Sequence, residues 1–494
     1  MDKLRFTLCF MVIGLFLAGC GKATTPEPTL TDPLPTYATV TRTQAVTPVV
    51  TMTAPPSPTA TYTAAPTKIP LTFTATPTVT VTPTRTASST PTRVPTHGDS
   101  FYPAISADGR YVVFASQAGD LVRGDKNRCR QMMANRYNCT DIYLHDRQEK
   151  SMRLVSKSPD GQPSNGDSWT PAISADGRWI VFVSSATNLV PGYTTYENGL
   201  YLYDVLSDNL KILAIQGGSA SISEDGRFIV YEKILRHGEI YLFDRETGMQ
   251  QTIIKTYDGQ PVNGDNWSPQ ISGDGRWIAF WSWASNLVPG DTEQCREEEE
   301  GVEDNTSCGD VFLYDRETGQ MERIPAGEGY GLGMIVFPLS LSDDGSRVLI
   351  IGKVFDRETG RTLCNDCWYG KLSANGKLVA YGTSPGFYVR HLATGNTELV
   401  SVASDGTPGN GEYIDYSVII EGPGFEPGFS LAADGRFVAF PSTATNLTAD
   451  EKQWCDYSPF PPHDCLDIYV HDRESGLTEL VSKSDPTVGW KENP

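Results

Sequence analysis

Acidic side chains are the most abundant groups in this 494-residue chain that could do chemistry. The chain has 60 Asp and Glu residues against 40 Lys and Arg, a net charge of −20. Loop carboxylates offer the oxygen ligands that calcium prefers, and two pairs have this placement: Asp125 with Asp141, and Asp291 with Asp310. No run matches the EF-hand spacing. Calcium is therefore a candidate cofactor at these four residues, and solvated acidic loops without any cofactor are the alternative.

A catalytic constellation is not evident. The chain has no Gly-x-Ser-x-Gly motif for a serine nucleophile. His145 and His471 occupy a strand position that holds Tyr203, Phe243 and Tyr314 in other copies of the same motif, which indicates a structural role. Paired carboxylates could cleave glycosidic bonds, but with 60 acids such pairs arise easily. We therefore assign no catalytic residue.

Cysteines are the third reactive group. Cys9 lies in an apolar N-terminal run and Cys20 ends it; the other eight form the close pairs Cys129 and Cys139, Cys295 and Cys308, Cys364 and Cys367, and Cys455 and Cys465. Local pairs in an exported chain predict four disulfides. The alternatives are metal binding, where only Cys465 has a histidine, His463, at ligand spacing, and a redox-active Cys364-x-x-Cys367 outside any helical pattern.

A repeated turn organises the elements that position these groups. Ser-x-Asp-Gly-Arg or a close variant starts at Ser106, Ser174, Ser223, Ser272, Ser342, Ser373 and Ala432. Asp-Gly suits a tight reversal because glycine takes φ > 0 without steric cost. An apolar run rich in β-branched and aromatic residues follows most copies, so each copy predicts a hairpin.

A second motif alternates with the turn, again in seven copies. Asp141-Ile-Tyr-Leu-His-Asp-Arg147 is an example, and most copies alternate as half-buried strands do. Each unit then holds four short strands; in the second unit we expect residues 171–174, 179–184, 200–204 and 211–215. Four-stranded units in series predict an all-β propeller of antiparallel blades. Seven blades are preferred, and six stay open because the interval from Ser342 to Ser373 is short.

The Ser-x-Asp-Gly-Arg hairpin with its downstream Ile-Tyr-x-x-Asp strand resembles the TolB-type propeller repeat of many exported bacterial proteins. The resemblance covers residues 98–485 and implies a WD40-like propeller without a specific function. The aromatic residue after the turn is expected to pack between blades.

The N-terminus has the pattern of an export signal. Lys3 and Arg5 precede an apolar run too short to span a bilayer. Leu17-Ala-Gly-Cys20 resembles the lipobox of bacterial lipoproteins, which implies a signal peptide over residues 1–19 and lipidation of Cys20; an ordinary secretory signal is the alternative. Residues 20–97, rich in Thr and Pro, read as an extended linker, and 486–494 as a tail.

Insertions between second and third strands are the candidate recognition elements. Those starting at Ala186, Ala284 and Ala444 begin alike, three cysteine pairs lie in such insertions, and all should emerge on one rim of the ring. We predict a lipid-anchored, extracytoplasmic, non-catalytic binding or scaffold module for a protein, peptide or glycan. The lipid is its only expected membrane contact, and the acidic charge argues against nucleic acid. The alternative is an exported glycoside hydrolase or lyase acting on cell-wall or polysaccharide material, which would need acids or histidines converging in the central channel.

Overall fold

The computed structural model describes residues 98–125, 139–193, 197–234, 238–291, 309–324, 339–411, 428–450, 454–455 and 463–485. All of them belong to Thr86–Pro494, one of two compact units into which the chain divides. The expected signal peptide (1–19), linker (20–97, with Cys20) and tail (486–494) lie outside the described residues and stay predictions. In the described part, no helix is long and apolar enough to cross a membrane.

Seven four-stranded antiparallel sheets form this unit, and each sheet takes its strands in chain order. The first four blades are β1 (Ser100–Ile105), β2 (Tyr111–Ser116), β3 (Asp141–Asp146) and β4 (Ser151–Leu154); β5 (Ser168–Ile173), β6 (Trp179–Ser184), β7 (Gly199–Asp204) and β8 (Asn209–Ile215); β9 (Gly217–Ile222), β10 (Phe228–Lys233), β11 (Glu239–Asp244) and β12 (Met249–Thr252); and β13 (Asn266–Ile271), β14 (Trp277–Ser282), β15 (Asp310–Asp315) and β16 (Met321–Ile324).

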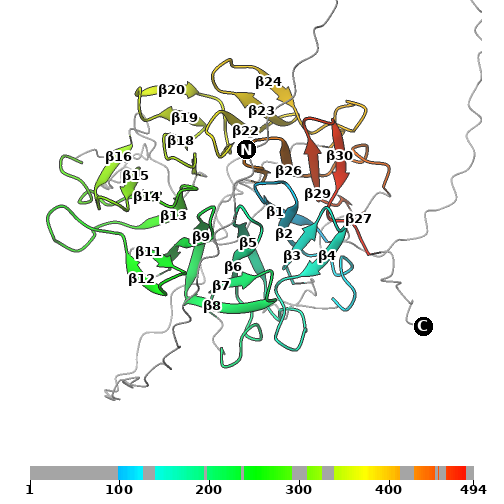
Figure 1. Ribbon diagram of the computed structural model, residues 1–494, viewed down its shortest axis with the longest axis horizontal. Coiled ribbons are helices and arrows are strands. Elements are labelled where there is room, and N and C mark those ends of the chain that lie inside the picture. The colour runs from blue at the N-terminus through cyan, green and yellow to red at the C-terminus, as the bar shows by residue number, and fades with distance from the viewer. Residues whose placement is uncertain are drawn as a thin grey trace, which may run out of the picture. The chain divides into compact units, whose positions relative to one another are not determined.

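The other three blades are β17 (Ser340–Leu341), β18 (Arg347–Ile350), β19 (Lys353–Asp356) and β20 (Arg361–Cys364); β21 (Lys371–Leu372), β22 (Leu378–Thr383), β23 (Gly386–His391) and β24 (Thr397–Leu399); and β25 (Ser430–Leu431), β26 (Phe437–Ser442), β29 (Asp467–Asp472) and β30 (Leu477–Leu480), with a ribbon of β27 (Trp454–Cys455) and β28 (His463–Asp464) in the last insertion. Figure 1 shows the sheets around a common centre, with β5 and β9 inside and β8 and β12 outside. The propeller prediction is confirmed with seven blades.

The fifth blade explains the short interval that left six blades open. Its strands contain only two to four residues, and β18 joins β19 through the two residues Ile351 and Gly352, both with positive φ (47° and 70°). This tight hairpin stands where the second, fourth and seventh blades have long insertions. The blade is small but complete, and it shares no strand with a neighbour.

The first five Asp-Gly turns are held by the same side-chain bonds, as the second blade illustrates. Ser174 Oγ donates to Asp176 Oδ1 at 2.5 Å and accepts from the Trp179 N–H at 2.9 Å. Gly177 has φ of +71°. A Cβ on Gly177 would lie 2.2 Å from the Tyr111 ring of the preceding blade. The glycine is required both by the turn and by the contact between blades.

Backbone hydrogen bonds join these turns into a nearly complete circle. They run from the N–H of Ala107 to Ala175 O (3.0 Å), Ala175 to Glu224 (3.0 Å), Glu224 to Gly273 (3.0 Å), Asp274 to Asp343 (3.1 Å), Asp343 to Ala374 (2.8 Å) and Ala433 to Ala107 (3.2 Å). The last bond joins the seventh blade to the first, which also share an apolar cluster containing Phe114 and Ile468. The ring therefore closes by packing and turn contacts, without strand exchange among the described residues.

An aromatic residue follows five of the seven turns and packs between blades, as expected. Trp179 lies between two guanidinium groups: Arg178 of its own blade, 4.7 Å from the ring centre, and Arg245 of the next blade, 4.2 Å away. The same arrangement encloses Phe228, Trp277 and Phe437. Cation–π contacts of this kind therefore add specific links to the apolar packing between blades.

Candidate functional site

A cavity of about 180 Å³ lies at the centre of the ring. The first strands of six blades line it (β1, β5, β9, β13, β21 and β25), mostly with apolar side chains such as Ile105, Ile173, Ile222 and Leu431. Among the residues that the structure describes, no aspartate, glutamate or histidine lines this cavity. The convergence of acids that would favour the enzyme alternative is not found there.

One register position sets the chemistry of the cavity. The residue two places before each turn motif is Ala104, Ala172, Ser221, Gln270, Ser340, Lys371 or Ser430. The three serines join blades, because Ser221 Oγ accepts from the Ile271 N–H (3.3 Å), Ser340 Oγ from Leu372 (3.0 Å) and Ser430 Oγ from Ile105 (3.4 Å). Gln270 and Lys371 are the two long polar side chains of this circle, and both line the cavity.

Sequence reasoning missed this circle of residues. The signal was present, because each member stands at a fixed offset from a turn that the sequence identified. The offset alone does not show that six of these residues, each from a different blade, surround one space.

Two carboxyl groups meet beyond the turn end of the cavity. Glu224 of the third blade and Asp343 of the fifth flank Gly273, whose added Cβ would lie 2.3 Å from Asp343 Oδ1 and 2.8 Å from Glu224 Cγ. Burial and a hydrogen bond with Glu224 raise the pKa of Asp343 to about 7. Carboxyls that bond directly are closer than the roughly 5 Å or more that separates the acids of glycoside-cleaving enzymes.

The opposite face, which carries the insertions between second and third strands, is called here the insertion face. In the second blade the insertion is clasped to the linker that follows β4. The Asn165 N–H donates to Asn188 Oδ1 (2.9 Å), and the Thr187 N–H donates to Asn165 Oδ1 (2.8 Å). Asn188 Nδ2 also donates to Pro163 O (2.8 Å). The two loops therefore brace one another.

The same clasp recurs in the fourth and seventh blades. Its asparagine pairs are Asn263 with Asn286 and Asn410 with Asn446. The linkers share an Asp-Gly-x-Pro-x-Asn pattern, starting at Asp160, Asp258 and Asp405. This second Asp-Gly repeat is the signal that could have revealed the clasp, and sequence reasoning overlooked it.

The first pair of calcium candidates is brought together. Asp141 is 1% exposed and accepts from the hydroxyls of Ser156 (2.5 Å) and Ser164 (2.8 Å). Burial and the nearby charge of Asp125 raise the pKa of Asp141 well above its usual range. The Tyr143 hydroxyl donates to Asp125. Protein hydroxyls therefore contact both carboxyls.

The second pair, Asp291 and Asp310, is bridged by a guanidinium group. Arg323 Nη1 lies 3.2 Å from Asp291 Oδ1 and 3.4 Å from Asp310 Oδ2. In the described part of the chain, neither pair belongs to a set of three His, Cys, Asp or Glu ligand atoms within 4.8 Å of one another. The arginine supplies the positive charge between these carboxylates, and calcium at either pair stays a prediction.

Two of the expected cysteine pairs are disulfide-bonded. The Cα atoms of Cys364 and Cys367 lie 6.1 Å apart and those of Cys455 and Cys465 lie 5.0 Å apart. Cys139 is also disulfide-bonded; its expected partner Cys129, and Cys295 and Cys308, lie outside the described residues. Asp99 and Asp366 each lie beside one bonded pair, within 4.8 Å of both sulfurs.

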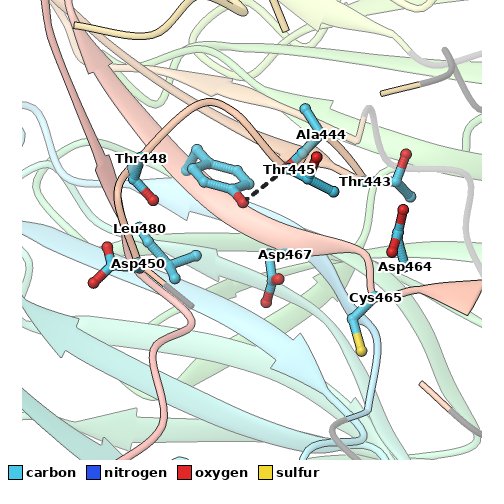
Figure 2. A pocket seen from close by; sticks show the side chains of 10 residues that line it. Thr443, Ala444, Thr445, Thr448, Asp450, Asp464, Cys465, Asp467 and Leu480 are labelled. Atoms are coloured by element: carbon cyan, nitrogen blue, oxygen red, sulfur yellow. Dashed lines mark hydrogen bonds between the residues drawn. The ribbon is translucent and has the colours of Figure 1, made fainter. Parts of the chain in front are cut away.

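A small polar hollow of about 20 Å³ lies in the seventh blade beside Cys465. Figure 2 shows Asp450, Asp464 and Asp467 around it, with a hydrogen bond from the Tyr469 hydroxyl to Ala444 O of 3.2 Å. This volume holds about one water molecule. The hollow is too small for a substrate.

The histidines and the repeated Asp-Arg pairs have structural surroundings. Burial lowers the pKa of both His145 and His471, and His471 Nδ1 lies 2.9 Å from Thr478 Oγ1. Asp146 accepts two bonds from Arg110 of the adjacent turn (Nε at 3.0 Å, Nη2 at 2.7 Å). The surroundings of His145 and His471 agree with the structural role expected for them, and the Arg110–Asp146 ion pair joins a turn to a strand of the same blade.

Comparisons with known proteins find solved structures of low sequence identity. No protein-family model matches the chain, and no curated protein sequence matches it. TolB from Acinetobacter baumannii aligns with 77% of this chain at 14% identity and a TM-score of 0.37; the match spans 65% of TolB, just under two thirds of its length. The β-propeller domain of the Trilobed protease from Pyrococcus furiosus aligns over 79% of this chain and 100% of that domain (11% identity, TM-score 0.44). Oligogalacturonate lyase from Vibrio parahaemolyticus aligns over 72% of this chain and 89% of the lyase (14%, 0.42).

Proposed function

We propose that the chain is an extracytoplasmic binding module whose insertion face recognises a protein, peptide or glycan without catalysis. Lipid on Cys20 would tether it to a membrane, and the Thr/Pro-rich linker over residues 20–97 would hold the propeller away from the lipid surface. A propeller fold alone serves binding and catalysis equally, so the insertion face is the surface to which this role is assigned.

The three asparagine clasps are the observation that carries this proposal. They brace loops on one face of the second, fourth and seventh blades through reciprocal amide bonds. Rigid loops lose little conformational freedom when they bind, which favours recognition of a large surface. The lining of the central cavity supports the non-catalytic side of the proposal, because no described acid or histidine contributes to it.

Site-specific photo-crosslinking in cells tests the face that binds. A photoreactive residue would replace exposed Pro191 or Pro289 on the insertion face, and exposed Thr247 or Thr318 on the turn face as matched controls. We expect a discrete crosslinked partner or glycan from the first two positions and none from the controls. Crosslinks confined to Thr247 and Thr318 would overturn the proposal. So would cleavage of an envelope polysaccharide by the purified full chain.

The anchor is tested separately. Cys20→Ser should remove metabolic labelling with a fatty acid and move the protein from the membrane fraction to the soluble fraction. Cys9→Ser is the control, because Cys9 lies within the segment expected to be removed. An unchanged distribution of the Cys20→Ser chain would contradict lipid anchoring.

A further inference from the structure

We propose that the central cavity binds a small organic carboxylate, with its carboxylate on Lys371 and its apolar part against the inner-strand aliphatic side chains. This site lies inside the ring and is independent of recognition at the insertion face.

The first argument is the singular place of Lys371 in the circle of residues two positions before each turn. The other members are small, hydroxyl-bearing or, in Gln270, neutral. The three serines are engaged in bonds between blades. A lysine is not needed at this position for the ring to close, because the six other blades close without one.

The positive charge of Lys371 has no counterion among the described residues. In the described part of the chain, no ion pair or hydrogen bond joins the Lys371 side chain to another residue, and no carboxylate lines the cavity. Among the described lysines, ion pairs are found for Lys157 with Asp208 (2.9 Å) and for Lys483 with Asp450. In a protein of net charge −20, a partly buried lysine among the residues that line this cavity offers a binding point for an anion that the protein does not supply.

The volume of the central cavity limits the size of the ligand. The cavity of about 180 Å³ slightly exceeds the roughly 150 Å³ apolar cavity that admits benzene. It therefore suits a carboxylate with about six further carbon atoms. Ile105, Ile173 and Ile222, on three neighbouring blades, supply the apolar contact. The alternative is that Lys371 binds no ligand: its aliphatic stem covers apolar surface while its ammonium stays in water.

Titration calorimetry of the full chain with benzoate and with benzamide separates these two readings. Benzamide has nearly the shape of benzoate but no charge. The variants are Lys371→Met, which keeps an apolar stem, and Lys377→Met, an exposed lysine on the turn of the same blade. Lys371→Gln replaces the first variant if Lys371→Met does not fold.

We expect benzoate to bind the wild type and Lys377→Met equally, and to bind Lys371→Met at least about tenfold more weakly, because a charged hydrogen bond is lost. Benzamide should bind the wild type as weakly as benzoate binds Lys371→Met. Absence of benzoate binding to the folded wild type, equal binding of benzoate and benzamide, or no loss in Lys371→Met would each overturn the proposal.

Discussion

Asp343 and Glu224 share a hydrogen bond across Gly273, and this bond ties the fifth blade to the third over the turn of the fourth. The same turns are linked by backbone bonds from Glu224 to Gly273 (3.0 Å) and from Asp274 to Asp343 (3.1 Å). Two carboxyls can bond only while one holds a proton. One part of the contact between blades is therefore controlled by pH.

The free energy of unfolding should decrease as pH rises from about 4 to about 7, because of Asp343. Its pKa in the folded protein is raised from 3.8 to about 7, so the folded chain holds a proton there that the unfolded chain releases, and stability decreases as pH rises through this window. The group is partly solvated, so we expect a loss on the order of 1–2 kcal/mol after screening.

Asp343→Asn, which mimics the protonated form, should be more stable than the wild type at pH 8 and equal to it near pH 4. Urea unfolding at both pH values measures this difference. The matched control is Glu358→Gln, which alters an exposed carboxyl of the same blade. Its stability relative to the wild type should be the same at both pH values. A constant difference between Asp343→Asn and the wild type across this range would contradict the shared proton.

Gly177→Ala should destabilise the propeller more than Gly161→Ala. Both glycines have positive φ (71° and 81°), so both alanines carry a conformational cost of about 1 kcal/mol. Only the Cβ at position 177 would also meet the Tyr111 ring, at 2.2 Å, whereas nothing lies within 4 Å of the Cβ at 161. We expect an additional loss of about 1–3 kcal/mol for Gly177→Ala, measured by denaturant unfolding. Equal losses would show that the contact between blades adapts freely.

Arg245→Met should weaken the contact between the second and third blades. Arg245 lies 4.2 Å from the Trp179 ring centre, and its Nε donates to Gly226 O at 2.8 Å. Loss of the cation–π contact and of one hydrogen bond should cost about 1–3 kcal/mol. The control is Arg361→Met, on an exposed position of β20, which should stay within about 0.5 kcal/mol of the wild type. If Arg245→Met loses no more stability than Arg361→Met, the Arg245–Trp179 contact does not stabilise the ring.

The sequence predicts the blades well because their determinants are local. Six Asp-Gly turns and one Asn-Gly turn mark seven hairpins, and the turns that begin with serine are stabilised by residues within five positions of it. The strand expected to begin at Pro171 instead begins at Ser168, since a bulge between Trp169 and Ala172 lets the strand continue past the proline. Thr170 takes a φ of 48° there, as Tyr102 and Ser268 do (both 50°) before the corresponding prolines of the first and fourth blades.

The groups at the centre of the ring could not be predicted, because only ring closure brings them together. Glu224 and Asp343 are distant in sequence and lie in turns that look alike. Lys371 follows the same rule: in isolation it is an ordinary lysine at the start of a short strand. The pair Asp291 and Asp310 shows a second limit of prediction from sequence. Both carboxylates are candidate calcium ligands, but the guanidinium group of Arg323 in the same blade lies between them.

Removal of one clasp should loosen the insertion of its own blade. Asn188→Ala deletes the acceptor for the Asn165 N–H and the donor to Pro163 O. Hydrogen–deuterium exchange should rise over residues 160–166 and 186–192, and stay unchanged at the fourth-blade clasp around Asn286. Because the two asparagines act together, the stability losses of Asn165→Ala and Asn188→Ala should fall short of additivity by about 0.5 kcal/mol or more in the double variant. Additive losses would mean that the two amides act independently.

Alkylation with and without reduction should decide between disulfides and metal binding for the paired cysteines. In the bonded form, Cys364, Cys367, Cys455 and Cys465 are protected from iodoacetamide until a reductant is added, and chelator has no effect. Metal-bound thiolates would react after treatment with chelator alone. We expect peptide mass spectrometry of the exported protein to show the first pattern. Cys455→Ser with Cys465→Ser should lower the free energy of unfolding by about 2–3 kcal/mol, as expected for a short closed loop. If these cysteines are labelled after treatment with chelator and without reductant, they bind a metal near Asp99 or Asp366 and are not disulfide-bonded.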